Sequence, residues 1–362
     1  MRRPRVVIVG GGPAGSAAAV AVAAAGGEAI VLERGQRGRE KACGDALPAL
    51  AVAALNSLGI TSPEQVGAIT VPGFRFVSTD HVEHTGSMVF WMTPRCVLDQ
   101  VLRDKAEVAG ASVSYQTRAR AVIERATSRL DVHATTRSGE KLVLDADAVV
   151  LAHGAATRIS TTWGVDGSPL RIPVITQYVE ADASDSLDFI FGPGITPGYE
   201  WDFPAPGGFR NVGRFATSAT GLRSDRRMVG TTPGLARSGP KWRGGWATLW
   251  SGHGKQWFDP RGVVSCGDAA GVIHPYNGAG IGEAIITGRM AGYYATRYAL
   301  DQRDVGHLRA FNDELTAWGG SLYDATNPVM HSWQRLVEGP EAEVGAVLRF
   351  LAAATSKLPA PG

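Results

Sequence analysis

Runs of apolar residues and a run of small residues follow one another in the first part of the chain. Residues 6–9 read Val-Val-Ile-Val and are apolar at every position, which is typical of a strand buried on both faces of a sheet. Residues 16–25 are Ala, Val and Ser, and they predict a helix that packs closely on this sheet and ends at Gly26-Gly27. Residues 29–32 predict a second buried strand. This order is that of a β-α-β unit with parallel strands.

The turn between the first strand and the helix is rich in glycine. It reads Gly10-Gly11-Gly12-Pro13-Ala14-Gly15 and matches the pattern Gly-x-Gly-x-x-Gly. Gly10 permits the tight turn, Gly12 lets the backbone approach a pyrophosphate, and Gly15 lets helix and strand come close. The N–H groups at the start of the helix favour an anion. The pattern therefore predicts a dinucleotide site.

Two charged residues end the second strand. Glu33 lies about 20 residues beyond the first glycine, where an acid accepts hydrogen bonds from ribose hydroxyls. Arg34 follows it directly, and we expect both side chains to contact the dinucleotide. This motif alone does not distinguish FAD from NAD(P).

Periodicity over the next hundred residues predicts both helices and strands. Residues 48–58 have helical composition, and 69–91 alternate apolar and polar residues like short strands. A helix is expected to start with Thr93 as N-cap and Pro94 at its first position, and to end at Gly110. Further strands are expected at 112–115, 118–125, 129–137, 140–144 and 148–151, with a hairpin turn at Ser138-Gly139.

The texture of the sequence changes between about residues 165 and 260. Turns containing Pro and Gly separate four strand-like segments, 173–181, 187–191, 199–203 and 209–215, which predict a largely antiparallel second domain. Buried-strand character returns at 263–265. A long helix is expected over 279–300, and residues 303–356 have mainly helical composition.

This pattern predicts a dinucleotide-binding fold assembled from both ends of the chain. We expect the cofactor domain to comprise residues 1–68, 92–165 and 261–300, and the substrate domain to comprise 69–91 and 166–260. Residues 301–362 are expected to form a C-terminal helical region.

The composition is that of an ordinary globular enzyme, with 44% hydrophobic and 19% charged residues. A net charge of +2 without basic runs predicts no nucleic-acid partner. Cys43, Cys96 and Cys266 are far apart, which favours neither disulfides nor a metal site and suggests a cytoplasmic protein. Met1-Arg2-Arg3 resembles an export signal, but cleavage near Ala25 would destroy the glycine motif. No apolar run of about 18 residues predicts a transmembrane segment.

Five sequence blocks, taken in order, resemble the geranylgeranyl reductase family. This family lies within the flavoprotein group that includes aromatic hydroxylases and flavin-dependent halogenases. The similarity runs from about residue 5 to 300. The blocks are Gly10 to Glu33; Lys41-Ala42-Cys43-Gly44-Asp45; Arg95 with Leu98-Asp99 and Leu102; Gly198-Tyr199-Glu200-Trp201-Asp202-Phe203-Pro204 with Asn211-Val212-Gly213; and Gly267-Asp268-Ala269-Ala270-Gly271 with Gly280-Ile281.

The resemblance implies an α/β fold with a Rossmann-type FAD-binding domain of the glutathione-reductase-like GR2 type. An inserted, largely antiparallel β-sheet substrate domain and C-terminal helices complete it. The FAD is expected to be non-covalent, with Arg95 and Gly267 near it, and with Asp268 accepting from a ribitol or ribose hydroxyl. Gly280 and Ile281 start a helix whose positive end faces the flavin.

Two positions depart from the family pattern, and both concern cofactor contacts. Ala279 stands where family members usually have Glu, so a polar contact near the flavin is lost. His153 stands where they usually have Asp, which puts any contact by that acid in doubt.

The resemblance also implies substrate-binding residues. Cys43 corresponds to a cysteine in a loop near flavin and substrate, where its thiol could donate a proton; a small residue packed under the loop is the alternative. Tyr199, Trp201 and Phe203 are expected to line the cavity of a small apolar substrate, with core packing as the alternative. His274 is expected near the flavin, although a surface or core histidine fits the sequence equally well.

Several reactions remain open at this level. The first is delivery of hydride from flavin N5 to a carbon–carbon double bond of an isoprenoid-like substrate. The second is a monooxygenase that hydroxylates or epoxidises an apolar or aromatic compound. A halogenase fits less well, because no lysine lies between Lys41 and Lys105. A non-enzymatic flavin binder is the fourth. No second glycine motif for NAD(P)H is present, so the donor is NAD(P)H docking transiently, ferredoxin, or reduced flavin from a separate reductase.

Overall fold

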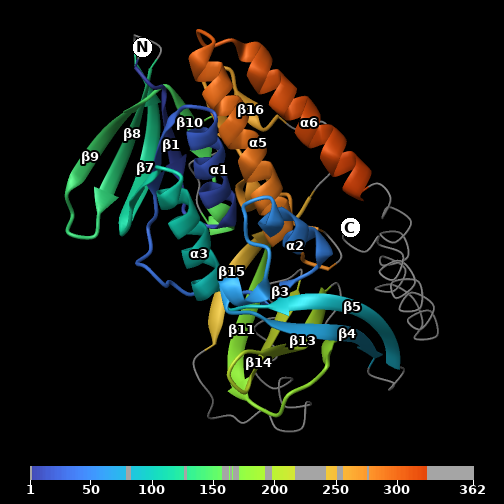
Figure 1. Cartoon of the computed structure of the whole chain (residues 1–362). Coiled ribbons are helices and arrows are strands. Elements are labelled where there is room, and N and C mark those ends of the chain that lie inside the picture. Colours follow the sequence, from blue (N-terminus) through green and yellow to red (C-terminus); the bar gives the residue numbers. More distant parts are fainter. Residues whose placement is uncertain are drawn as a thin grey trace.

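The computed structural model describes residues 2–78, 83–125, 129–156, 163, 165, 171–191, 198–216, 242–250, 256–274 and 277–323. Figure 1 shows two regions: a sheet wrapped by helices, and below it a larger sheet that contains β4, β5, β11, β13 and β14. The expected division into domains stays a prediction. The part of the expected C-terminal helical region beyond residue 323 lies outside the described residues.

The first region is built on a six-stranded sheet of order β16-β17-β10-β1-β2-β6. Its strands are β1 (Arg5–Val9), β2 (Glu28–Leu32), β6 (Ser112–Ser114), β10 (Ala148–Leu151), β16 (Phe258–Asp259) and β17 (Val263–Ser265). All neighbours pair in parallel except β16 with β17. The carboxyl ends of β1, β2, β10 and β17 therefore meet at one edge, and these strands come from both ends of the chain.

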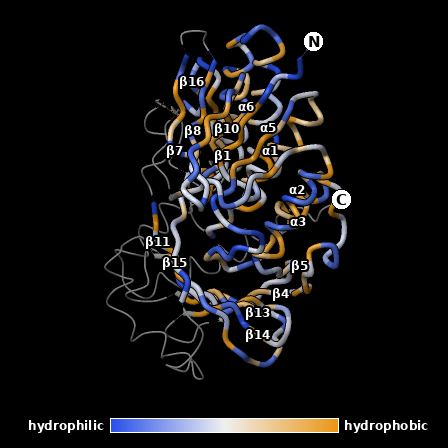
Figure 2. Tube along the Cα trace, turned by 90° about the vertical axis from the view of Figure 1, so that its left-hand side faces the viewer, coloured by the Kyte–Doolittle hydropathy of each residue, from blue (hydrophilic) through white to orange (hydrophobic). Residues whose placement is uncertain are grey.

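Helices cover one face of this sheet. They are α1 (Pro13–Ala24), α5 (Ile281–Leu300) and α6 (Val305–Tyr323), and their apolar side chains share one core with Val6, Ile8 and Val150. Figure 2 shows hydrophobic residues concentrated along β1, β10 and α1. Two further helices, α2 (Ala49–Asn56) and α3 (Arg95–Val108), pack beside α1 and α5, and short 3-10 turns span Pro63–Val66, Gly154–Ala156 and Gly267–Ala269.

The contact between α1 and α5 is unusually close because α5 presents glycines to α1. A Cβ added at Gly288 would lie 2.1 Å from the carbonyl oxygen of Ala14, and one at Gly292 would lie 2.3 Å from that of Ala18. No side chain fits between the two backbones at these points. The N-terminal and C-terminal parts of the sequence are therefore packed directly on each other.

A small antiparallel sheet covers the opposite face. It contains β7 (Thr117–Glu124), β8 (Leu130–Thr136) and β9 (Lys141–Ala146) and lies beside β1 and β10 in Figure 1. Its apolar side chains form a second core with Val7, Val9 and Val149. The fully apolar runs of β1 and β10 are explained by this arrangement, because each strand is buried on both faces.

The larger sheet has eight strands in the order β15-β11-β14-β13-β12-β4-β5-β3. Their bounds are β3 (Ala46–Leu47), β4 (Ile69–Ser78), β5 (Glu83–Met92), β11 (Arg171–Glu180), β12 (Ser186–Phe191), β13 (Gly198–Ala205), β14 (Phe209–Ala216) and β15 (Arg243–Thr248). Pairing is antiparallel throughout except between β12 and β4. One face carries an aromatic core that includes Phe74, Phe189, Tyr199, Trp201 and Phe203.

The predicted N-cap of α3 is wrong by one residue. Pro94, not Thr93, is the N-cap, and the helix begins at Arg95. The Thr93 hydroxyl instead donates a hydrogen bond of 2.6 Å to the carbonyl oxygen of Val66. A tertiary partner has therefore taken the side chain that local sequence assigned to capping. Residues 69–91 also form two long strands rather than several short ones, with an irregularity between Val71 and Gly73.

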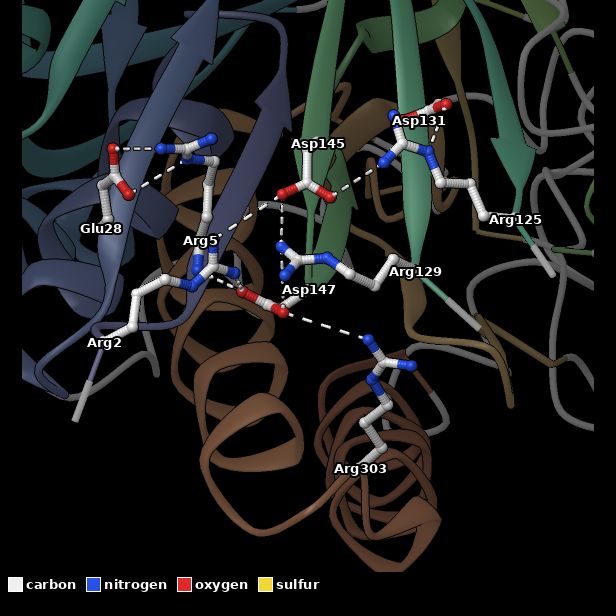
Figure 3. A network of polar contacts seen from close by, with 9 residues as sticks. All are labelled: Arg2, Arg5, Glu28, Arg125, Arg129, Asp131, Asp145, Asp147 and Arg303. Carbon is white, nitrogen blue, oxygen red and sulfur yellow. Dashed lines mark hydrogen bonds and ion pairs between the residues drawn. The ribbon is translucent and has the colours of Figure 1, made fainter. Parts of the chain in front are cut away.

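An ionic network closes the amino end of the six-stranded sheet (Figure 3). Asp147, just before β10, accepts hydrogen bonds from the backbone N–H of Arg5 at 2.8 Å and from the side chain of Arg2 at 2.7 Å. Arg129, just before β8, and Arg303, at the turn after α5, also form ion pairs with it. Asp147 thus connects the six-stranded sheet, the small antiparallel sheet and the turn between α5 and α6. This network lies at the end of the six-stranded sheet opposite the glycine motif. Among the described helices, none combines the length and apolar character needed to cross a membrane.

Candidate functional site

A cleft of about 960 Å³ opens at the carboxyl edge of the six-stranded sheet. Of the residues predicted to bind the cofactor, Gly10, Gly12, Pro13, Ala14, Glu33, Arg34, Arg95 and Asp268 line it. Gly280 and Ile281 line a smaller adjoining cavity. Gly15 and Gly267 line neither and act beneath the surface, as described below. The structure thus brings together residues that are more than 200 positions apart.

The glycine motif has the shape of a diphosphate cradle. A Cβ on Gly10 would lie 2.4 Å from the Ala152 carbonyl oxygen, and one on Gly15 would lie 1.8 Å from that of Gly10. A Cβ on Gly12 would instead point toward open space, 3.9 Å from the guanidinium of Arg39. Helix α1 starts here without any side-chain cap, so its first N–H groups face the cleft.

Glu33 organises this loop as well as lining the cleft. Its carboxylate accepts hydrogen bonds from the backbone N–H groups of Gly11 at 2.9 Å and Gly35 at 2.6 Å, and it pairs with Arg39 at 3.0 Å. The side chain of Arg103, from α3, donates to the carbonyl oxygen of Gly11 at 2.9 Å. Gly11 is thus fixed from both sides, which preorganises the backbone that would meet a pyrophosphate.

The cleft also contains basic side chains that the sequence did not predict to lie there. Arg39, Arg118 and Arg120 line it together with Arg34. Burial and the charges of Arg39 and Arg118 lower the pKa of Arg34, although the carboxylate of Glu33 acts in the opposite direction. Such a cluster suits a diphosphate. No sequence pattern marks Arg39, Arg118 and Arg120, because Arg39 lies in a loop and the other two lie on the strand β7.

The second motif adds a carboxylate and a helix start. Asp268 pairs with the ammonium group of Lys41 at 3.1 Å and lines both cavities. Gly267 adopts φ +60°, and a Cβ there would lie 2.8 Å from that of Ala14, so this turn must pack directly on α1. Helix α5 begins after Gly280 without a side-chain cap, next to the smaller cavity.

His153 occupies the cleft where the family pattern has an acid. Its Nδ1 lies 2.7 Å from the carbonyl oxygen of Gly154, so Nδ1 carries the proton and Nε2 has a lone pair. Nε2 is buried and has no hydrogen-bond partner in the structure. Burial lowers the pKa of His153 to about 4, so the ring is neutral near pH 7. It is therefore suited to accept a hydrogen bond from a hydroxyl group of the dinucleotide.

The smaller cavity, of about 110 Å³, has a mainly apolar lining and adjoins the cleft. Cys43, Tyr199, Trp201 and Phe203 line it, together with Gly280 and Ile281. Pro13, Lys41, Arg95 and Asp268 line both spaces. The structure thus brings the predicted cysteine and aromatic residues together beside the larger cleft. The assignment of these side chains to substrate stays a prediction.

The surroundings of Cys43 keep its thiol protonated. Its Sγ accepts a hydrogen bond from the backbone N–H of Asp45 at 3.4 Å. Burial raises the pKa of the thiol, and the nearby charge of Arg95 opposes this. The guanidinium of Arg95 is itself bound by both oxygens of Asp99, at 2.8 and 3.0 Å. A protonated thiol beside a fixed cation can act as an acid, because the cation stabilises the thiolate left behind.

Tyr199 and His274 frame the loop before α5. The Tyr199 hydroxyl donates a hydrogen bond of 2.6 Å to the carbonyl oxygen of Asn277, and burial raises its pKa. The backbone of His274 closes the same loop by bonding to Ala279 at 2.8 Å and Gly278 at 3.1 Å. Burial lowers the pKa of the His274 ring to about 4. His274 lines neither of the two cavities, so its proposed contact with substrate stays a prediction.

Comparison with known proteins agrees with this geometry. Residues 4–186 match the family model described as pyridine nucleotide-disulphide oxidoreductase. A menaquinone reductase of Mycolicibacterium smegmatis is 30% identical over 81% of this chain and 76% of its own. A digeranylgeranylglycerophospholipid reductase of Methanopyrus kandleri is 30% identical over 96% and 93%. The crystal structure of a geranylgeranyl bacteriochlorophyll reductase-like protein from Thermoplasma acidophilum matches with a TM-score of 0.82 and 22% identity, over 99% and 92%.

These similarities confirm the predicted fold class and the predicted dependence on FAD. The cradle, the basic cluster and the two uncapped helix starts fit such a cofactor. The chain belongs to the geranylgeranyl reductase family of FAD-dependent oxidoreductases.

Proposed function

We propose that the protein reduces a carbon–carbon double bond of an apolar, isoprenoid-like substrate. The observation that carries this proposal is a protonated, half-buried thiol at the junction of the larger cleft and an aromatic cavity. Reduction of a double bond needs a hydride on one carbon and a proton on the other. Bound FAD would supply the hydride after its own reduction.

The chain's own residues supply the remaining functions. The Gly10–Gly15 loop, the arginine cluster and Asp268 would hold the cofactor non-covalently through hydrogen bonds and charge. The aromatic walls formed by Tyr199, Trp201 and Phe203 would exclude water and take up part of an apolar chain. Cys43 would give its proton to the second carbon, and the charge of Arg95 would stabilise the resulting thiolate.

The names of the relatives support the substrate class. One is a menaquinone reductase and another a digeranylgeranylglycerophospholipid reductase, and the second name contains an isoprenoid group. The small cavity suits a segment of such a chain rather than a whole lipid, with the rest lying outside. The electron donor, whether NAD(P)H, ferredoxin or reduced flavin, would meet the bound cofactor directly or through a separate reductase.

The test is an anaerobic reaction of the reduced holoenzyme with geranylgeraniol in deuterated water. We expect a reduced product that carries deuterium on both carbons of the former double bond, because the hydrogen at N5 of reduced flavin and the thiol hydrogen both exchange with solvent. Cys43→Ala should slow the transfer by about 10²–10⁴-fold, the range for general acid catalysis, and Cys43→Ser should slow it less. Reduction of the flavin should be unchanged in both variants, because that step needs no thiol. Turnover that requires O2 and incorporates labelled oxygen would instead identify a monooxygenase.

A further inference from the structure

Asp45 is a buried carboxyl group that the proposed reaction does not yet use. Only 3% of the residue is exposed, and its backbone has φ +63°, a conformation that residues other than Gly adopt infrequently. Its carbonyl oxygen accepts a hydrogen bond from the N–H of Thr93 at 3.2 Å, which fixes this turn. The fold therefore holds the carboxyl group in one place, two residues after Cys43.

The Asp45 carboxyl joins the cysteine loop to the eight-stranded sheet. The hydroxyl of Tyr178, on β11, donates a hydrogen bond to it. The amide nitrogen of Asn211, on β14, donates both to the carboxyl at 2.6 Å and to the carbonyl oxygen of Cys43 at 2.8 Å. Trp201 and Thr176 donate to the amide oxygen of Asn211, so the orientation of this amide is determined.

Charged and titratable groups surround Asp45 from each element packed on it. Arg95 and Cys96 face it from α3, Tyr178 faces it from β11, and Lys41 and Cys43 lie on its own loop. Burial raises the pKa of Asp45 to about 7, although Tyr178, Asn211 and Arg95 act in the opposite direction. The group therefore changes its charge near neutral pH, where a carboxyl group is ordinarily ionised.

Asp45 also interacts with the thiol itself. Its backbone N–H donates to Cys43 Sγ, and the negative charge of its carboxylate raises the pKa of Cys43. Tyr178 extends the network outward, since its ring is half-buried and the guanidinium of Arg243 lies 5.7 Å from the ring centre. The carboxyl group is thus bonded to a half-buried phenol, and Asp45 is connected to the cysteine through its backbone N–H and through the amide of Asn211.

We infer that Asp45 returns a proton to Cys43 after each turnover and is itself reprotonated from solvent along Tyr178. This inference rests on the proposed function. Asp45 does not touch the substrate itself and acts only through Cys43. After Cys43 has given up its proton, the Asp45 O–H bond breaks and the S–H bond of Cys43 forms again. The carboxylate left behind is stabilised by Tyr178, Asn211 and the backbone N–H of Arg95 until water restores its proton. No oxidant or reductant enters these steps.

The kinetic test compares the first turnover with later ones. The thiol of the reduced enzyme is already protonated before the first turnover, so this turnover does not need Asp45. Asp45→Asn should therefore slow steady-state turnover at least about tenfold more than it slows a single turnover. The wild-type pH profile of steady-state turnover should have a limb near pH 7, and Asp45→Asn should lose it. Tyr178→Phe should show a smaller effect of the same kind. Asp188→Asn is the matched control, because it removes another buried carboxylate of the same sheet, paired with Arg75.

A second measurement needs no substrate and separates this inference from the proposed function. Alkylation of Cys43 in the holoenzyme by iodoacetamide, followed on its peptide by mass spectrometry, reports the thiolate fraction. In the wild type, the alkylation rate of Cys43 should rise less steeply above about pH 7, because ionised Asp45 raises the pKa of the thiol. Asp45→Asn should lack this change of slope and should be alkylated severalfold faster above that pH. Identical profiles for wild type and Asp45→Asn would overturn the inference even if the enzyme reduces double bonds. An inflection without any reduction would refute only the proposed function.

Discussion

The close contact between α1 and α5 allows a stability test in which two effects act in opposite directions: a gain in helix propensity and a steric clash. Replacing a glycine by alanine in an exposed helix stabilises it by about 1 kcal/mol. At Gly288 the added Cβ would lie 2.1 Å from the carbonyl oxygen of Ala14, far inside any normal contact. The obstacle is backbone in a second helix, so it cannot turn away as a side chain could. The helices must separate.

The magnitude follows from these two terms. Overpacking of a well-packed core costs about 1–3 kcal/mol, and a clash with backbone belongs at the upper end of that range. Subtracting the gain in helix propensity leaves a net loss of about 2 kcal/mol for Gly288→Ala. That loss corresponds to a decrease of about 4 °C in melting temperature for a chain of this size class. Because Ala14 lines the cofactor cleft, FAD affinity should decrease as well.

The assay is thermal unfolding followed by circular dichroism, with FAD release measured by fluorescence in the same samples. Arg289→Ala is the control, since this neighbouring residue of α5 is exposed. It should change the melting temperature by less than 2 °C, consistent with about ±0.5 kcal/mol for surface positions. A melting temperature for Gly288→Ala equal to or above that of wild type would refute the packing argument.

Four further outcomes are expected. Gly12→Val should abolish FAD binding, measured by the flavin absorbance of the purified protein, because its side chain would enter the open space of the cradle. Glu33→Ala should weaken FAD by at least about 1–3 kcal/mol in fluorescence titration, since it frees two backbone N–H groups besides losing the expected ribose contact. Asp268→Ala should lower the FAD content of the purified protein. A normal FAD content with lost activity would show that Asp268 does not bind the cofactor. His153 and His274 have pKa values lowered to about 4 by burial, so between pH 6.5 and 4 the unfolded chain binds protons that the folded chain does not. The contribution of these two residues to stability should therefore fall as pH decreases from 7 to 5.5, and replacing both by Gln should remove that contribution from the pH dependence of thermal melts.

Much of the cofactor-binding fold could be predicted from the sequence because local signals and tertiary environment agree there. Residues 6–9 are apolar throughout, and β1 is buried on both faces. The glycines that end α1 and permit its start have backbone roles that few other residues can fill. The N-cap of α3 could not be predicted, since the distant Val66 carbonyl decides where the Thr93 hydroxyl bonds. The strand Arg243–Thr248 was also missed, because paired glycines weaken any strand pattern and its pairing with β11 supplies the missing stabilisation.

The candidate site could be predicted in part, for a similar reason. Motif residues such as Gly12, Asp268 and Cys43 were found, and the structure gathers them around two adjoining cavities. The cations that surround them were not found, since Arg39 and Arg118 occupy positions where nothing in the sequence separates a ligand from a solvated surface residue. The burial of a carboxyl group in the cysteine loop depends on β11 and β14, which the local sequence does not contain.

The pairing of Lys41 with Asp268 joins residues 227 positions apart, and this has a consequence for biosynthesis. At about 5–20 residues per second, a ribosome needs on the order of tens of seconds to make the intervening chain. During that time β10 is made and can pair with β1, but α5 is still missing, so the glycine loop has no second wall and the face of α1 that α5 covers stays open. FAD can therefore enter only after residues near 300 have left the ribosome. Chains truncated before α5 should therefore contain no flavin.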